Sequence, residues 1–270
     1  MKVEAVGKRV SVLGEGPHWD NRSSTLIYVD VLKREIVRFD PQTKTESVVA
    51  SQDGRIGTAI PYAEDSSQMV VCIENRIYKL DTGTQDKTLL VELNESAPSR
   101  FNDGKCDAAG RLWTGTMPKL VNFKKPPQGE HNLYSFSNGS LGLRAPQVSF
   151  SNGMAWTSDN RTMFHNQSIP GTTYVYDFDQ NTGELSNRRI LVEFRTTPEY
   201  KDLGVPDGMT VDANNKIWMV CFGAGSVIQV DPETAKILTR VQLPTKYPQS
   251  CCFGGKNYDV LYVTSVSHFP

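Results

Sequence analysis

Four short polar segments carry oxygen-bearing side chains beside glycine. They are Glu15 in Gly14–Pro17, Asn102 in Phe101–Gly104, Asn152 in Ser151–Met154 and Asp207 in Pro206–Met209. Carboxylate and amide carbonyl oxygens, without histidine or cysteine, are ligands of hard cations such as Ca²⁺, Mg²⁺ or Mn²⁺. Two carboxylates balance a divalent charge. If the four side chains meet, they predict one metal site.

Taken singly, each segment has a simpler interpretation. Asn or Asp before Gly is common in ordinary turns. Glu15 is less ordinary, because a charge that faces inward at a strand entry needs a partner. The metal hypothesis therefore depends on the four residues occupying equivalent positions of a repeated structure.

The elements that would position these residues are strands. Short runs rich in Val, Ile, Tyr and Phe alternate with Gly, Asn, Asp and Pro, and no long helical period is present. Two units recur: an apolar strand after a polar turn, as in Ile217–Val220, and a strand that ends in an Asp turn, as in Ile36–Thr43. The repeats start near the following positions: Glu15, Gly57, Asn102, Asn152, Asp207 and Ser250.

These starting points lie roughly 40–55 residues apart, close to the length of a four-stranded propeller blade. The sequence therefore predicts an all-β fold, a six-bladed β-propeller forming a single domain over residues 1–270. The last blade is apparently incomplete at the C-terminus, because the chain stops just after the second strand of that blade. We expect the stretch Val3 to Val12 to supply its outermost strand, which still leaves one strand missing.

Composition narrows the classes of partner. The formal net charge is -1 and no long basic run occurs, so we expect neither nucleic acid nor a membrane surface as partner.

The N-terminus lacks a signal-peptide core and no apolar run reaches membrane-spanning length, which predicts a cytoplasmic protein. The five cysteines show no C-x-x-C spacing, which argues against a disulfide framework or a zinc site.

A family resemblance covers nearly the whole chain. The segments Gly14–Trp19, Arg100–Lys105, Ser151–Met154, Pro206–Met209 and Cys251–Asn257 resemble the regucalcin (SMP-30)/gluconolactonase family, with similarity to its insect members. The resemblance implies one divalent ion (Ca²⁺, or Zn²⁺, Mn²⁺ or Mg²⁺) held by Glu15, Asn152 and Asp207, with Asn102 close by. It also implies hydrolysis of a sugar lactone such as gluconolactone, with Arg100 and Asn102 contacting the substrate.

The residues suit that reaction. A divalent ion would polarise the lactone carbonyl and lower the pKa of a bound water. Asp207 would then take the proton from the water. Without the resemblance, Arg100 is equally well a surface charge. We expect Asp103 and Lys105 to orient a turn, and we expect Trp113, Trp156 and Trp218 to lie in the core.

Two other functions stay open. The chain could be a calcium-binding regulatory protein without turnover, or an enzyme of the luciferin-regenerating type that acts on oxyluciferin. Leu120 and Gln167 replace acidic residues of the relatives, so substrate specificity or metal binding would differ. For any enzyme of this kind we expect a small-molecule lactone substrate and a monomer or weak dimer.

Overall fold

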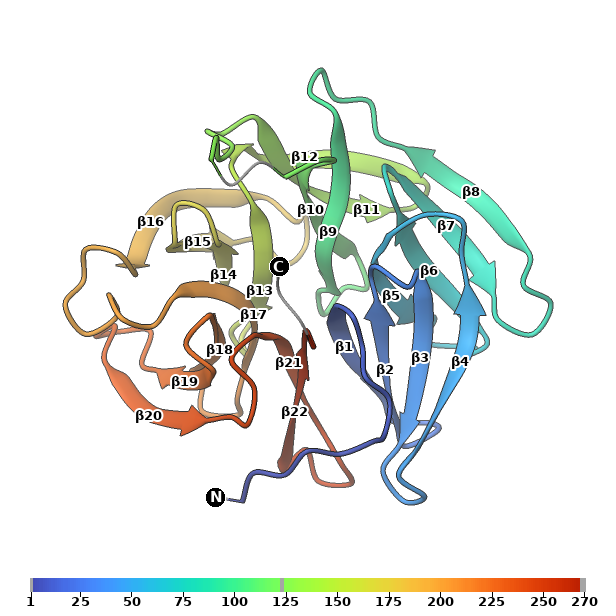
Figure 1. The fold of residues 1–270 in the computed structure, drawn as a ribbon. Helices are drawn as coiled ribbons and strands as arrows, with labels where there is room; N and C mark the ends of the chain where they lie inside the picture. The colour runs from blue at the N-terminus through green and yellow to red at the C-terminus, as the bar shows by residue number, and fades with distance from the viewer. Residues whose placement is uncertain (1, 122–123, 268–270) are drawn as a thin grey trace.

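The computed structural model describes residues 2–121 and 124–267, which form antiparallel β-sheets arranged in a ring (Figure 1). Five sheets have four strands each, and a sixth has two. The all-β propeller expected from the sequence is confirmed. A complete sixth blade is not: within the described residues the last sheet consists of β21 and β22 alone.

In chain order the strands are β1 (Gly14–Asp20), β2 (Thr25–Asp30), β3 (Glu35–Asp40), β4 (Thr45–Ser51), β5 (Ile56–Pro61), β6 (Gln68–Ile73), β7 (Arg76–Asp81), β8 (Lys87–Glu92), β9 (Ser99–Cys106), β10 (Leu112–Pro118), β11 (His131–Ser137), β12 (Ser140–Val148), β13 (Ser151–Trp156), β14 (Thr162–Gln167), β15 (Thr172–Phe178), β16 (Leu185–Glu193), β17 (Val205–Val211), β18 (Ile217–Phe222), β19 (Ser226–Val230), β20 (Ile237–Gln242), β21 (Pro248–Gly254) and β22 (Val260–Ser265).

Each sheet is a meander in which consecutive strands are neighbours. The first strand of each sheet (β1, β5, β9, β13, β17 or β21) packs against the first strands of the adjacent sheets. The ring closes where β1 contacts β21, the first strand of the last sheet. All six predicted repeat starts fall within these inner strands, although the last, Ser250, lies one residue beyond the position in β21 that corresponds to Asp207 in β17.

The core lies between neighbouring sheets. In β18, Ile217, Met219 and Cys221 join a cluster on one face of the sheet, and Trp218 and Val220 join another cluster on the opposite face. Because successive side chains of a strand point to opposite faces, a blade buried on both sides needs a continuous apolar run. This explains why Ile217–Val220 does not alternate with polar residues.

The predicted Asp turns join the third and fourth strands of the sheets. The Oδ1 atoms of Asp40, Asp81 and Asp179 each accept a backbone N–H two residues further on, at 2.8 Å. Backbone hydrogen bonds of this kind hold the pKa of each of the three carboxyls below its usual range, because they stabilise the charged form.

The expected closing strand from Val3 to Val12 is wrong. Residues 2–12 form no strand, and they bind the first sheet instead of the last. The N–H groups of Lys8 and Arg9 donate to Oε2 of Glu46 at 3.0 and 2.7 Å, and Val12 donates to Asp30 at 2.9 Å. Since side-chain carboxylates already satisfy these donors, no ladder forms with β22. An isolated bridge between Leu13 and Val266 links the two ends.

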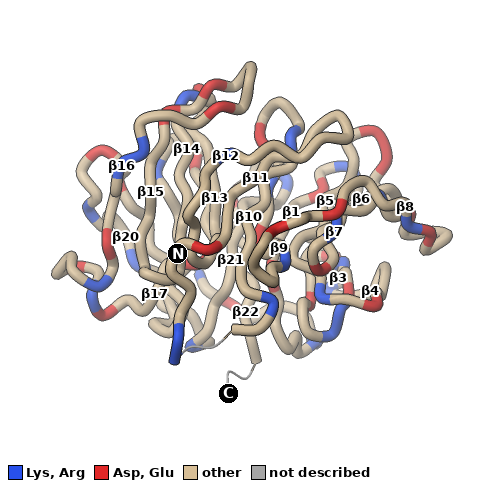
Figure 2. The backbone as a smooth tube through the Cα atoms, turned by 90° about the horizontal axis from the view of Figure 1, so that it is seen from above, with Lys and Arg blue, Asp and Glu red and all other residues tan. Residues whose placement is uncertain are grey.

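Acidic and basic residues are interspersed around the ring (Figure 2), in keeping with the formal net charge of -1. Among the described residues, no helix is long and apolar enough to cross a membrane.

Candidate metal centre

The predicted ligands lie in β-bulges of the inner strands. The pairing register shifts between Glu15 and His18 in β1, between Ser151 and Met154 in β13, and between Pro206 and Met209 in β17. A bulge inserts an extra residue and re-aims a side chain out of the regular ladder. The sequence placed the ligands just before these strands. They lie inside them, and the bulges are what make their positions special.

The glycines that follow Asn152 and Asp207 permit close contact between blades, whereas Gly16 after Glu15 has a positive φ of 51° and no close contact at its Cβ position. A Cβ built on Gly153 would lie 2.6 Å from the backbone nitrogen of Met209 in the next blade, where real Cβ atoms are essentially never found. Gly153 and Gly208 are not among the residues with positive φ. The turn interpretation of Asn152-Gly153 and Asp207-Gly208 is therefore wrong, because these glycines serve packing and not a left-handed turn.

Amide hydrogen bonds fix the orientation of Asn152. Its Nδ2 donates to Oγ of Ser168 at 2.8 Å, and its Oδ1 accepts from Nδ2 of Asn102 at 3.2 Å. Oδ1 of Asn102 in turn accepts from Nη1 of Arg100 at 3.1 Å. Asn152 thus presents an oxygen on the side of its neighbour Asn102, while the oxygen of Asn102 is engaged by the guanidinium.

Glu15 and Asp207 meet at Gln249, a buried residue of β21. With its nitrogen turned toward them, the Gln249 amide donates to Oε1 of Glu15 at 3.0 Å and to Oδ2 of Asp207 at 3.1 Å. Asp207 Oδ1 is buried and has no hydrogen-bond partner among the described residues. Carboxylates from the first and fifth sheets therefore approach the same point, and one oxygen there is left without a partner.

Burial, and then the crowding of carboxyl groups, raises the pKa values of the acids at this site. Burial, and then the nearby Asp103, raise the pKa of Glu15 to about 8. Burial, followed by Glu15 and Asp103, raises the pKa of Asp207 well above its usual range. Burial likewise raises the pKa of Asp103, although Lys105 opposes the shift. Without a cation between them, these groups favour the neutral form.

Arg100 is buried beside this cluster and is not a surface charge. Burial lowers its pKa to about 10, and its Nη1 donates to the carbonyl of Phe101 at 2.9 Å. Its Nε has no hydrogen-bond partner among the described residues. This guanidinium therefore keeps a free donor, which a ligand with hydroxyl or carboxylate groups could occupy.

The donor set suits a hard divalent cation. In residues 2–121 and 124–267 no group of three or more His, Cys, Asp or Glu side chains is placed to hold a metal ion. The candidate ligands are accordingly two carboxylates, Glu15 and Asp207, together with amide oxygen. A divalent ion would bind the unpartnered Asp207 oxygen and stabilise the charged form of both carboxylates, which burial and then the neighbouring carboxyls disfavour. All-oxygen donors favour Ca²⁺, Mg²⁺ or Mn²⁺ over Zn²⁺.

Sequence reasoning missed two residues of this cluster. Asp103 does bond the N–H of Gly104, at 2.8 Å, but it also acts electrostatically on Glu15 and Asp207. Gln249 lies in the bulge of β21, at the register position that Asp207 occupies in β17. The repeat read from the sequence came within one residue of it, at Ser250. The glycine marker could not have found it, because Ser250 follows Gln249.

The three tryptophans, Leu120 and Gln167 take no part in the hydrogen bonds described above for Glu15, Asn152 and Asp207. Trp113 and Trp218 are buried as expected, whereas Trp156 is half-buried. Leu120 is 85% exposed. Gln167 is buried, and its side-chain oxygen accepts the N–H of Ser149 at 3.1 Å. The contact of Gln167 is thus with the backbone of a preceding loop.

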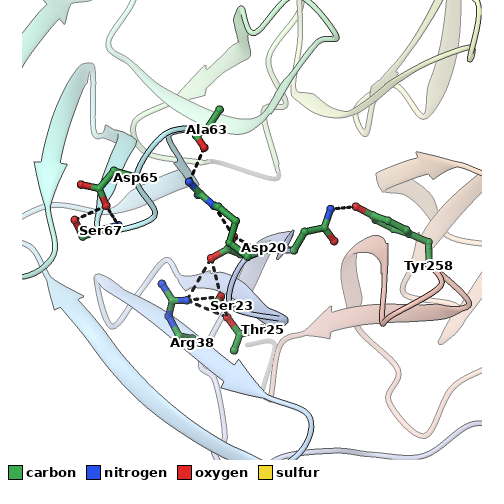
Figure 3. Close-up of polar contacts among 10 residues, drawn as sticks. Asp20, Ser23, Thr25, Arg38, Ala63, Asp65, Ser67 and Tyr258 are labelled. Carbon is green, nitrogen blue, oxygen red and sulfur yellow. Dashed lines mark hydrogen bonds and ion pairs between the residues drawn. The ribbon is translucent and has the colours of Figure 1, made fainter.

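A cavity of about 970 Å³ lies at the opposite end of β1, near Asp20 and not near Glu15. Its polar groups bind one another (Figure 3): Arg22 donates to the carbonyl of Ala63 at 2.6 Å, and the Asn21 amide bonds the Tyr258 hydroxyl. These contacts hold loops of three sheets together. We therefore take the carboxylate cluster, and not this cavity, as the candidate functional site, because the cluster has side chains that can bind a metal ion.

Fold and site together define a β-propeller with a buried centre of carboxylates and amides. The chain belongs to the SMP-30/gluconolactonase/LRE-like family, whose model matches residues 13–267.

Among curated relatives, regucalcin of Danio rerio is 37% identical over 267 residues, covering 98% of this chain and 86% of the relative. Among solved structures, a luciferin-regenerating enzyme superposes with a TM-score of 0.88 at 29% identity, covering 95% of this chain and 85% of that chain. A protein described as calcium-binding, regucalcin from Agrobacterium tumefaciens, has a TM-score of 0.85 at 23% identity, covering 96% and 84%. This last likeness shows the fold alone.

Proposed function

We propose that the chain is a divalent-metal-dependent hydrolase of sugar lactones such as gluconolactone, working at the centre of a six-bladed propeller whose last blade begins with β21 and β22. The observation that carries the proposal is the meeting of Glu15 and Asp207 at one buried point, where an Asp207 oxygen has no partner among the described residues. Membership of a family that includes gluconolactonases supports the reaction class. A single domain, the cytoplasm as location and a monomer or weak dimer stay predictions.

Each residue has a distinct role in this proposal. Glu15, Asn152 and Asp207 would hold the ion through their oxygens, and Asn102 keeps Asn152 in its orientation through the 3.2 Å hydrogen bond. The bound ion would supply Lewis-acid polarisation of the lactone carbonyl and acidify water. Asp207 would accept the proton of the attacking water.

Arg100 would bind the sugar. Its Nε has no partner within the described part of the protein, and its neighbour Asn102 is part of the site. A guanidinium in this position can donate to a hydroxyl of the substrate or to the carboxylate that forms when the ring opens. Truncating it to Arg100→Met should raise KM more than it lowers kcat.

Steady-state hydrolysis of gluconolactone, with and without chelator, tests the proposal. Chelator should abolish the activity, and Ca²⁺ or Mn²⁺ should restore it. Asp207→Asn should lower kcat/KM by about 100-fold or more, the usual contribution of a general base. Asp202→Asn, which changes an exposed acid shortly before β17, serves as the matched control. Full activity of Asp207→Asn, or activity in excess chelator, would refute the proposal.

Two other outcomes would select the alternatives. Tight Ca²⁺ binding without turnover on a panel of lactones would favour a calcium-binding regulatory role. Turnover of oxyluciferin but not of gluconolactone would favour the luciferin-regenerating type, to which the TM-score of 0.88 draws attention.

A further inference from the structure

Gln249 lies at the same bulge position as Asn152 and Asp207, but on the two-stranded sheet. The register of β21 and β22 shifts between Pro248 and Cys251, as that of β17 and β18 shifts around Asp207. The side chain of Gln249 is buried, and its amide reaches Glu15 and Asp207 together. The sheet that has only two strands in the described residues therefore still sends a polar group to the centre.

The Gln249 amide has two orientations with opposite consequences. With the nitrogen inward it donates to both carboxylates, at 3.0 and 3.1 Å, and bridges them by hydrogen bonds. With the oxygen inward, three oxygens from three sheets surround one point. Amide oxygen and nitrogen are nearly equal in size, so the exchange needs little movement of the protein.

The presence of a cation decides which orientation is favourable. Three oxygens at hydrogen-bond distance repel one another unless a positive charge lies among them. The unpartnered Oδ1 of Asp207 adds a further oxygen at the same place. An ion would therefore favour the oxygen-inward amide, and its removal would favour the nitrogen-inward amide.

Resting on the function proposed above, we propose that Gln249 is a metal ligand that turns into a hydrogen-bond clamp on Glu15 and Asp207 when the ion leaves. The last sheet then takes part in ion binding and does more than close the ring. It also keeps the two carboxylates in place in the metal-free protein, so that the site stays formed for the next ion.

Calorimetric titration with Ca²⁺ and thermal unfolding of the metal-free protein test this role. Gln249→Leu keeps the approximate volume but removes oxygen and nitrogen. It should bind Ca²⁺ about 10-fold more weakly, a typical loss when a supporting group of a metal site is removed. It should also lower the Tm of the metal-free protein by a few degrees, since two carboxylates lose their donor.

Gln249→Glu separates a ligand from a packing residue. The added carboxylate should restore Ca²⁺ affinity to the wild-type level or above, while the Tm of the metal-free protein falls further because three acids are crowded together. A residue that only fills space would weaken binding in both variants. Gln242→Leu on the exposed face of β20 is the matched control and should leave affinity unchanged.

The outcomes distinguish this inference from the function on which it rests. If the wild-type protein binds Ca²⁺ and Gln249→Leu binds it with the same affinity, the role of Gln249 is overturned but the proposed function is not. Tighter Ca²⁺ binding by Gln249→Leu would also overturn the role of Gln249, because that result would mean that the amide nitrogen of wild-type Gln249 always faces inward and competes with the ion. A wild-type protein that binds no divalent ion would overturn both.

Discussion

The packing role of Gly153 makes a quantitative prediction. The Gly153→Ala substitution would place a methyl group 2.6 Å from the Met209 nitrogen and 2.8 Å from the carbonyl carbon of Gly208. Ordinary contact begins at 3.4 Å. The nearest backbone atom, the carbonyl oxygen of Asp207, would lie at 2.4 Å. The two inner strands β13 and β17 must therefore separate by about 1 Å, and no flexible side chain can yield, because the atoms that clash belong to the backbone.

Such overpacking costs about 1–3 kcal/mol, and rigid backbone contacts place Gly153 at the upper end. At roughly 2–4 °C per kcal/mol for a domain of this size, we expect Gly153→Ala to lower Tm by about 6–12 °C. The separation would also pull Asn152 away from Asp207, so Ca²⁺ affinity should fall together with Tm.

Thermal unfolding and Ca²⁺ titration of two variants would measure this effect. Gly142→Ala on β12 is the matched control, because its methyl group would meet only the end of the Arg144 side chain. It should change Tm by less than about 2 °C, within the range of a surface substitution. If Gly153→Ala were as stable as Gly142→Ala, the glycine would not be there for close contact and the turn interpretation would return.

Two further predictions concern the buried acids. Because the folded pKa values of Glu15 and Asp207 lie above their unfolded values, metal-free protein should lose stability as pH rises from about 5 to 8. Glu15→Gln should flatten this trend, and Ca²⁺ should suppress it. A Tm of the metal-free protein that rises over this range would contradict the assignment. Asp107→Ala removes the acceptor of Trp113 Nε1 (2.8 Å) and Arg111 Nε (2.7 Å), so urea unfolding should show a loss of about 3–5 kcal/mol with little change for the exposed Asp159→Ala. A loss below about 1 kcal/mol, the worth of one ordinary hydrogen bond, would mean that those donors find other partners.

The architecture could be predicted from the sequence because each blade repeat consists of turns and strands that are determined by residues close together in the chain. Asp turns such as those at Asp40 and Asp81 and apolar runs such as Ile217–Val220 depend on nearby residues alone. The conformation of the stretch Val3 to Val12, in contrast, depends on residues far away in the sequence. Its donors are satisfied by Glu46 and Asp30, side chains whose availability depends on the folded first sheet.

The candidate site was readable where a glycine accompanied the polar residue, as at Asn152 and Asp207. Gln249 escaped because Ser250 follows it where glycine follows Asn152 and Asp207, and only the register of the bulges places it correctly. Asp103 escaped for another reason. Its bond to the Gly104 backbone is what a turn residue would make, and its effect on Glu15 acts through space, from β9 to β1.

Closure of the ring between β1 and β21 bears on the order in which the molecule folds. Glu15 and Gln249 come from near opposite ends of the sequence, so their encounter has one of the largest loop-closure costs in the chain. Blades can form one after another from local meanders, but the centre is assembled only when the first and last inner strands meet. The contact between Glu15 and Gln249 would therefore mark the final step of folding, and it would hold together the one seam of the ring that no continuous stretch of chain connects.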